Sequence, residues 1–213
     1  MLLHLIKKDF LIAKKYLLIM LLISVFIPIF VIWYVPELGA EIGFVLSVIF
    51  TVFMILQQVS IKEYQYPKVS ALLCSAPYPR KFLVLSKYGF CIGIYFLCSL
   101  IYLIEITLFP MYGKLSINLV LGMFLILSVF IGVFLPIQFK YGYAKTKFIF
   151  MIVIMTSPIL FPQLIKLDKG LSLNIVNTIS PVFLYVIVAL ISISILMISA
   201  LISIKIFEDK DLA

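Results

Sequence analysis

Long apolar runs separated by short polar segments are the dominant pattern of this chain. Each run is long enough for a helix to cross the hydrocarbon core of a bilayer, which takes about 17–25 residues. The six runs cover residues 16–35, 41–61, 88–109, 118–138, 148–165 and 179–204. We therefore predict an all-α integral membrane protein with six transmembrane helices, in which residues 1–213 form a single transmembrane domain.

Residues 2–15 precede the first span and mix apolar with basic positions. The apolar residues at helical spacing are Leu3, Ile6, Phe10 and Ala13, and the polar ones are His4, Lys7, Lys8, Lys14 and Lys15. Two interpretations remain open. One is an amphipathic helix that lies in the membrane interface with its lysines at the lipid phosphates. The other is a basic flank that only orients the first span.

The longest polar interruption is the loop 62–87, which holds three of the ten prolines and the arginine Arg80. After Pro67, the apolar residues Val69, Leu72, Leu73 and Ala76 follow at i, i+3, i+4 and i+7. This spacing predicts a short helix with one apolar face, which Pro77 and Pro79 end. Arg80 and Lys81 then open the helix that becomes the third span. The apolar face either docks on a partner protein or lies on the inner membrane surface.

Few polar residues lie inside the predicted spans. Gln57 and Gln58, near the inner end of the second span, must face protein or water. Glu105 lies about one turn from the outer end of the third span, where it is either a snorkelled or neutral side chain or a substrate or gating contact. Gly89 and Gly93 form a pair of small residues that allows close helix packing, which we expect within the subunit.

The fifth apolar run contains Pro158 and Pro162, four residues apart. Two prolines at this spacing make a straight helix unfavourable. We expect a helix to about Thr156 and then a broken, re-entrant or interfacial outer segment over residues 157–178, because irregular backbone is tolerated only against protein or a water-filled path.

Hydrophobic residues make up 65% of the chain and charged residues 12%, which excludes an ordinary soluble domain. The net charge of +8 is unevenly distributed. Three of the 17 basic residues, Lys114, Lys166 and Lys169, fall in the predicted outer loops, and the remaining fourteen lie in the other polar segments. Because basic residues stay on the cytoplasmic side, both termini are predicted to be cytoplasmic, and the charge does not indicate a nucleic-acid partner.

Residues for catalysis and metal binding are not found in a recognisable pattern. The one histidine, His4, cannot build an HExxH site. The pair Gly113–Lys114 is followed by Leu115, so it is not a phosphate-binding loop. We predict no catalytic residues and no metal site, and the chain is not expected to be an enzyme by itself.

Taken together, the chain resembles the membrane subunit of ABC type-2 export permeases. Within that family it resembles the small bacterial branch that includes exporters of phenol-soluble-modulin and antimicrobial peptides. The motifs that carry the resemblance are LIKKDFLIAKKY, SALLCSAPYPRKFLVLSKY and IKIFEDKDL. The loop residues that fit the family pattern are Glu63, Leu72, Leu73, Pro77, Arg80, Lys87 and Tyr88, and the chain departs from the pattern at Ala76 and Pro79.

The resemblance implies a permease in the bacterial plasma membrane that exports a hydrophobic or amphipathic substrate, such as a peptide. Two copies would form a homodimer, and each copy would dock one cytoplasmic ATPase subunit that binds ATP and Mg²⁺. The implied docking residues are Glu63, Val69, Leu72, Leu73, Pro77, Arg80 and Lys81. The resemblance implies that the broken segment 157–178 forms the outer gate. Together with the polar residues of the spans, we expect a translocation path or gate with Gln57, Gln58, Glu105, Pro158 and Pro162.

Two alternatives remain open. A permease of the same class could serve antimicrobial immunity or sensing instead of secretion. A non-transporting membrane scaffold or assembly factor would have no stable ATPase partner.

Overall fold

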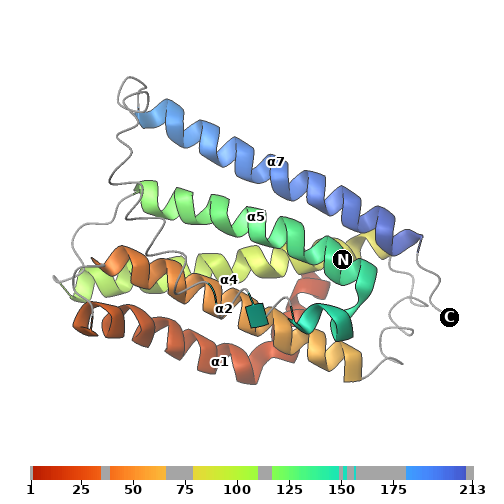
Figure 1. Ribbon diagram of the computed structural model, residues 1–213, viewed down its shortest axis with the longest axis horizontal. Helices are drawn as coiled ribbons and strands as arrows, with labels where there is room; N and C mark the ends of the chain where they lie inside the picture. The colour runs from red at the N-terminus through yellow and green to blue at the C-terminus, as the bar shows by residue number, and fades with distance from the viewer. Residues whose placement is uncertain are drawn as a thin grey trace.

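The structure is a computed structural model that describes residues 2–34, 39–65, 79–109, 117–148, 151–152, 156 and 181–209. Within these residues, five long helices run along the long axis of the molecule (Figure 1). They are α1 (Leu2–Tyr34), α2 (Gly39–Gln65), α4 (Arg80–Leu108), α5 (Ile117–Tyr141) and α7 (Pro181–Glu208).

All five of these helices are long and apolar enough to cross a membrane. They correspond to the first four predicted spans and to the last one. The predicted fifth span, 148–165, lies largely outside the described residues, as does the predicted broken segment 157–178. As predicted, Arg80 opens the helix that contains the third span.

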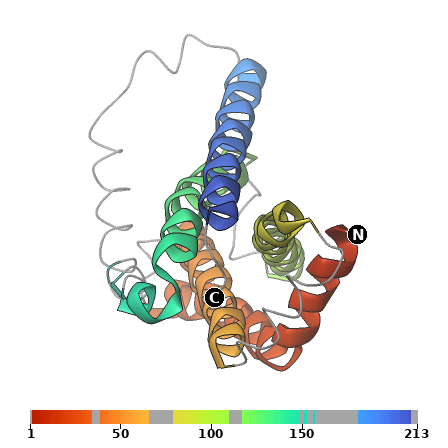
Figure 2. The same ribbon diagram turned by 90° about the vertical axis from the view of Figure 1, so that its right-hand side faces the viewer.

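The helix α1 joins the predicted interfacial segment and the predicted first span in one continuous helix of 33 residues. Figure 2 looks nearly along the axes of α2 and α4. The N-terminal turns of α1 run across this view, which shows that α1 bends. Three of the four lysines of these turns, Lys7, Lys14 and Lys15, are exposed, whereas Lys8 is half-buried.

The packed face of the N-terminal turns consists of Leu5, Asp9 and Ala13, which are separated by four residues each and are all buried. Of the predicted apolar stripe, Ala13 is buried, Ile6 and Phe10 are half-buried, and Leu3 is 78% exposed. The carboxylate of Asp9 occupies the packed face, where it pairs with Lys87 of α4 and with Lys8 of its own helix.

The helix α2 forms the centre of the bundle and contacts α1, α4 and α5 (Figure 2). Its fully buried side chains include Phe44, Ile49 and Phe53. On α4, Gly89 and Gly93 pack directly against Ile6 and Phe10 of α1. The predicted packing of this glycine pair within the subunit is therefore confirmed.

A hydrogen-bond node joins α4, α5 and α7 within the apolar bundle. The hydroxyl of Tyr88 lies 2.6 Å from the Oγ atom of Ser199 and 2.8 Å from that of Ser203. Ser199 donates to the backbone oxygen of Gly132 at 2.7 Å. Because hydrocarbon offers no alternative partners, these buried hydroxyls hold the three helices in a defined register.

We expect the substitution Tyr88→Phe to lower the stability of the folded protein by about 1–2 kcal/mol, because it removes both serine contacts of the tyrosine hydroxyl. The measurement is the thermal unfolding midpoint of the protein purified in neutral detergent. The control is Tyr141→Phe, at a side chain that is 52% exposed. Equal midpoints for the two variants would show that the node contributes nothing.

Candidate functional site

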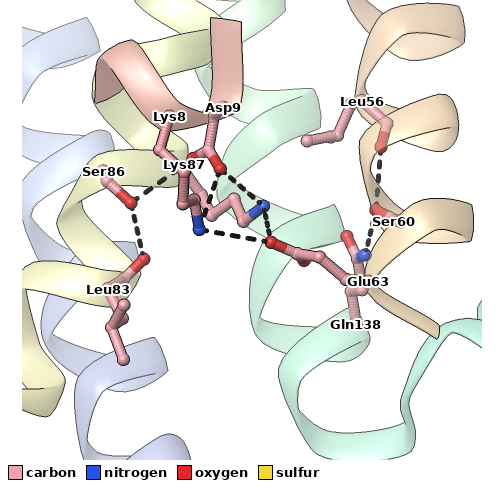
Figure 3. Close-up of polar contacts among 9 residues, drawn as sticks. All are labelled: Lys8, Asp9, Leu56, Ser60, Glu63, Leu83, Ser86, Lys87 and Gln138. Atoms are coloured by element: carbon pink, nitrogen blue, oxygen red, sulfur yellow. Dashed lines mark hydrogen bonds and ion pairs between the residues drawn. The ribbon is translucent and has the colours of Figure 1, made fainter. Parts of the chain in front are cut away.

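A cluster of charged side chains lies at the end of the bundle where α2 ends and α4 begins (Figure 3). We call it the ion cluster. Its members are Lys8 and Asp9 from α1, Glu63 from α2, and Ser86 and Lys87 from α4. Three helices that are distant in sequence thus meet through polar contacts at one end of an otherwise apolar bundle.

The two lysines and two carboxylates of the ion cluster form a closed ring of ion pairs. The Nζ atom of Lys87 lies 2.6 Å from Oε1 of Glu63 and 3.5 Å from Oδ1 of Asp9. The Nζ atom of Lys8 lies 3.2 Å from Oδ1 of Asp9 and 3.8 Å from Oε1 of Glu63. Each lysine therefore contacts both carboxylates, and the ring has no net charge.

The ion cluster is buried most deeply at Asp9, whose side chain is 0% exposed, while that of Lys87 is 10% exposed. Lys8 and Glu63 lie nearer to solvent, with side chains 25% and 31% exposed. Ser86 adds a weak contact to Asp9 at 3.5 Å and donates a shorter hydrogen bond to the backbone oxygen of Leu83. A buried charge without a partner is strongly unfavourable, so the three helices must stay together for the ring to be satisfied.

A second polar link lies one turn before Glu63 on α2. Ser60 donates its hydroxyl proton to the backbone oxygen of Leu56 at 2.8 Å, and its oxygen accepts from the side-chain amide of Gln138 on α5 at 2.6 Å (Figure 3). This link connects α5 to the same end of α2 that holds the ion cluster.

Of the predicted docking residues, Glu63 belongs to the ion cluster, and Arg80 begins α4, although its side chain is not among the described ones. Lys81 is exposed. The remaining docking residues, Val69, Leu72, Leu73 and Pro77, lie outside the described residues. The ion cluster thus joins the two helices that flank the predicted docking loop.

The predicted path residues are not brought together in the described part of the chain. Gln57 and Gln58 are half-buried on α2, and Pro158 and Pro162 lie outside the described residues. Glu105 is 4% exposed, and within the described residues neither of its carboxylate oxygens has a hydrogen-bond partner. It follows Lys87 by 18 positions on α4, which places it about 27 Å farther along the helix at 1.5 Å per residue.

The sequence patterns predict no role for Lys8, Asp9 or Ser86, and they place Lys87 only among the residues that fit the family pattern. A signal for Asp9 was present, because it is the single acidic residue before Glu37 and follows Leu5 by one helical turn. An acidic residue on the apolar side of a membrane helix requires a cationic partner. Its partner Lys87 is 78 positions away, and no local pattern connects the two.

Comparison with known proteins places the chain in a family. A family model described as an ABC-2 family transporter protein matches residues 4–208. No curated protein and no solved structure matches the chain. Members of this family are non-catalytic membrane components that generally partner with ATPase subunits. Because the match spans nearly the whole sequence and the described helices are of membrane-spanning length, this chain belongs to the ABC-2 family of transporter membrane proteins.

Proposed function

We propose that the chain is the permease subunit of an ABC exporter, which moves a hydrophobic or amphipathic substrate outward with ATP hydrolysed by a separate subunit. The observation that carries the proposal is the family match over residues 4–208. The absence of a phosphate-binding loop from the sequence supports a separate ATPase. The resemblance to peptide exporters favours a peptide as the substrate.

In this proposal, two copies of the chain form a homodimer in the bacterial plasma membrane and dock two ATPase subunits, which bind ATP and Mg²⁺. The loop between α2 and α4 provides the docking surface on the cytoplasmic side. The distribution of basic residues supports this orientation, because fourteen of the 17 lie in segments assigned to that side.

We further propose that the ion cluster couples the docking loop to α1. A movement of the ATPase would displace the end of α2 and the start of α4, which carry Glu63 and Lys87. Asp9 would have to follow, because separation from Lys87 and Lys8 would leave a buried carboxylate unpaired. The N-terminal turns of α1 would therefore move together with the loop.

The docking surface is tested by the double substitution Leu72→Glu and Leu73→Glu. We expect the variant to insert normally and to lose most of the ATPase subunit that copurifies with the unaltered chain, because two charges replace the apolar face of the predicted loop helix. The control is Tyr141→Glu, which places a charge at an exposed position at the end of α5. Undiminished copurification with the double variant would contradict the docking position.

A further inference from the structure

A pocket of about 240 Å³ lies beside the ion cluster, among the ends of α2, α5 and α7. It is larger than the cavity of about 150 Å³ that can accommodate benzene, so a small organic group fits inside. Glu63 and Lys87 form the part of its wall that is shared with the ion cluster. Neither the family match nor the docking role of the loop assigns a ligand to this pocket.

Aromatic rings from three parts of the chain line the pocket. Tyr64 at the end of α2 contacts Tyr143 with ring centroids 5.7 Å apart. Phe139 of α5 contacts Phe207 of α7 edge-to-face, with centroids 5.5 Å apart. Four rings around one space form a wall that is apolar and that also attracts cations through the negative faces of the rings.

The ring of ion pairs is neutral as a whole, and the charged group that it leaves accessible to a ligand in this pocket is the carboxylate of Glu63. The ammonium group of Lys87 is already held between Glu63 and Asp9, and its side chain is 10% exposed. The side chain of Glu63 is 31% exposed, and both of its ion pairs use Oε1. Within the described residues, Oε2 of Glu63 is therefore the carboxylate oxygen that remains for a ligand.

We propose that this pocket binds the ammonium head of an amphipathic molecule. The rings would contact the cation and its first methylene groups, and Oε2 of Glu63 would accept a hydrogen bond from it. An anionic head fits poorly, because it would have to draw Lys87 away from two carboxylates. A role of the pocket in loading substrate for export rests on the proposed function, whereas the binding itself does not.

The test uses a tryptophan reporter in the purified chain without any ATPase. Trp33 is the single tryptophan and is 83% exposed on α1. The substitutions Trp33→Phe and Phe207→Trp move the fluorophore into the pocket wall and keep the wall aromatic. The probe is octylammonium in neutral micelles, with octanol as the uncharged control and octyl sulfate as the anionic control.

We expect a saturable fluorescence change with octylammonium and none that saturates with octanol or octyl sulfate. In the reporter background, Glu63→Gln should weaken octylammonium binding at least about tenfold through loss of the charge-assisted bond. Tyr143→Leu should weaken it about fivefold through loss of one ring. The matched control Tyr141→Leu changes a ring that is not part of the pocket and should leave binding unchanged.

Equal responses to octylammonium and octyl sulfate, or equal binding by the Tyr143→Leu and Tyr141→Leu variants, would overturn the proposal. The comparison of Tyr143→Leu with Tyr141→Leu tests the proposal even if Glu63→Gln disturbs the ion cluster. Competition by a lysine-containing amphipathic peptide, but not by its acetylated form, would identify a peptide as the source of the ammonium group. Competition by phosphatidylethanolamine would identify a lipid. Because no ATPase is present in the assay, the binding result stands even if the chain proves not to be an exporter subunit.

Discussion

The substitution Asp9→Ala is expected to destabilise the protein more than any other change in the ion cluster. It removes a carboxylate that is 0% exposed and leaves Lys8 and Lys87 to share Glu63 alone. Removing one partner of a buried ion pair typically costs about 3–5 kcal/mol, because the remaining charge stays buried without compensation. The measurement is the thermal unfolding midpoint of the protein purified in neutral detergent.

The control for this prediction is Lys7→Ala, two positions from Asp9 on the exposed side of α1, which should have little effect. The double variant Asp9→Leu with Lys87→Met should recover part of the lost stability, because an apolar pair can replace a buried ion pair at little cost. The cluster has no structural importance if Asp9→Ala unfolds at the same temperature as Lys7→Ala.

The second large effect is expected for Gly43→Ala, where α2 touches α1. A Cβ atom at Gly43 would lie 2.7 Å from the Cα atom and 3.1 Å from the Cβ atom of Pro28. The nearer of these atoms belongs to the backbone and cannot rotate away, so the two helices would have to separate. We expect a loss of about 1–3 kcal/mol in stability, which is typical of overpacking.

Gly122→Ala is the matched control, because a Cβ atom at Gly122 of α5 meets nothing within 4 Å. Both substitutions add one methyl group inside a helix and gain the same helix propensity, so their difference reports the steric contact alone. Thermal unfolding of the two variants in the same detergent measures this difference. If Gly43→Ala were as stable as Gly122→Ala, the close packing of α1 on α2 would be refuted.

Hydropathy was sufficient to predict the five helices of membrane-spanning length among the described residues, because the apolar length that a bilayer requires can be counted in the sequence. The predicted third and fourth spans, 88–109 and 118–138, correspond to α4, which ends at Leu108, and to α5, and the resemblance led to the correct family. The opening of α4 at Arg80 was also predictable, because Pro77 and Pro79 end any preceding helix.

The ion cluster could not be predicted in the same way. Hydropathy treats Asp9 as one more polar residue in a basic segment, although the structure places it on the packed face beside Lys87. This pairing depends on how α1 bends and packs against α4, which is a property of three-dimensional contacts and not of local spacing. The sequence predicts a docking role for Glu63, but its contacts with Lys8 and Lys87 are visible only in the three-dimensional structure.

The central claim, that this chain is the membrane half of an ABC exporter, is tested most directly by its partners. The measurement is affinity purification from the native membranes in mild detergent, with identification of copurifying proteins and an ATPase assay on the eluate. We predict a stoichiometric ATPase with a phosphate-binding loop and vanadate-sensitive turnover. Recovery of this chain alone, under conditions that keep known transporter complexes intact, would contradict the permease and favour a membrane scaffold.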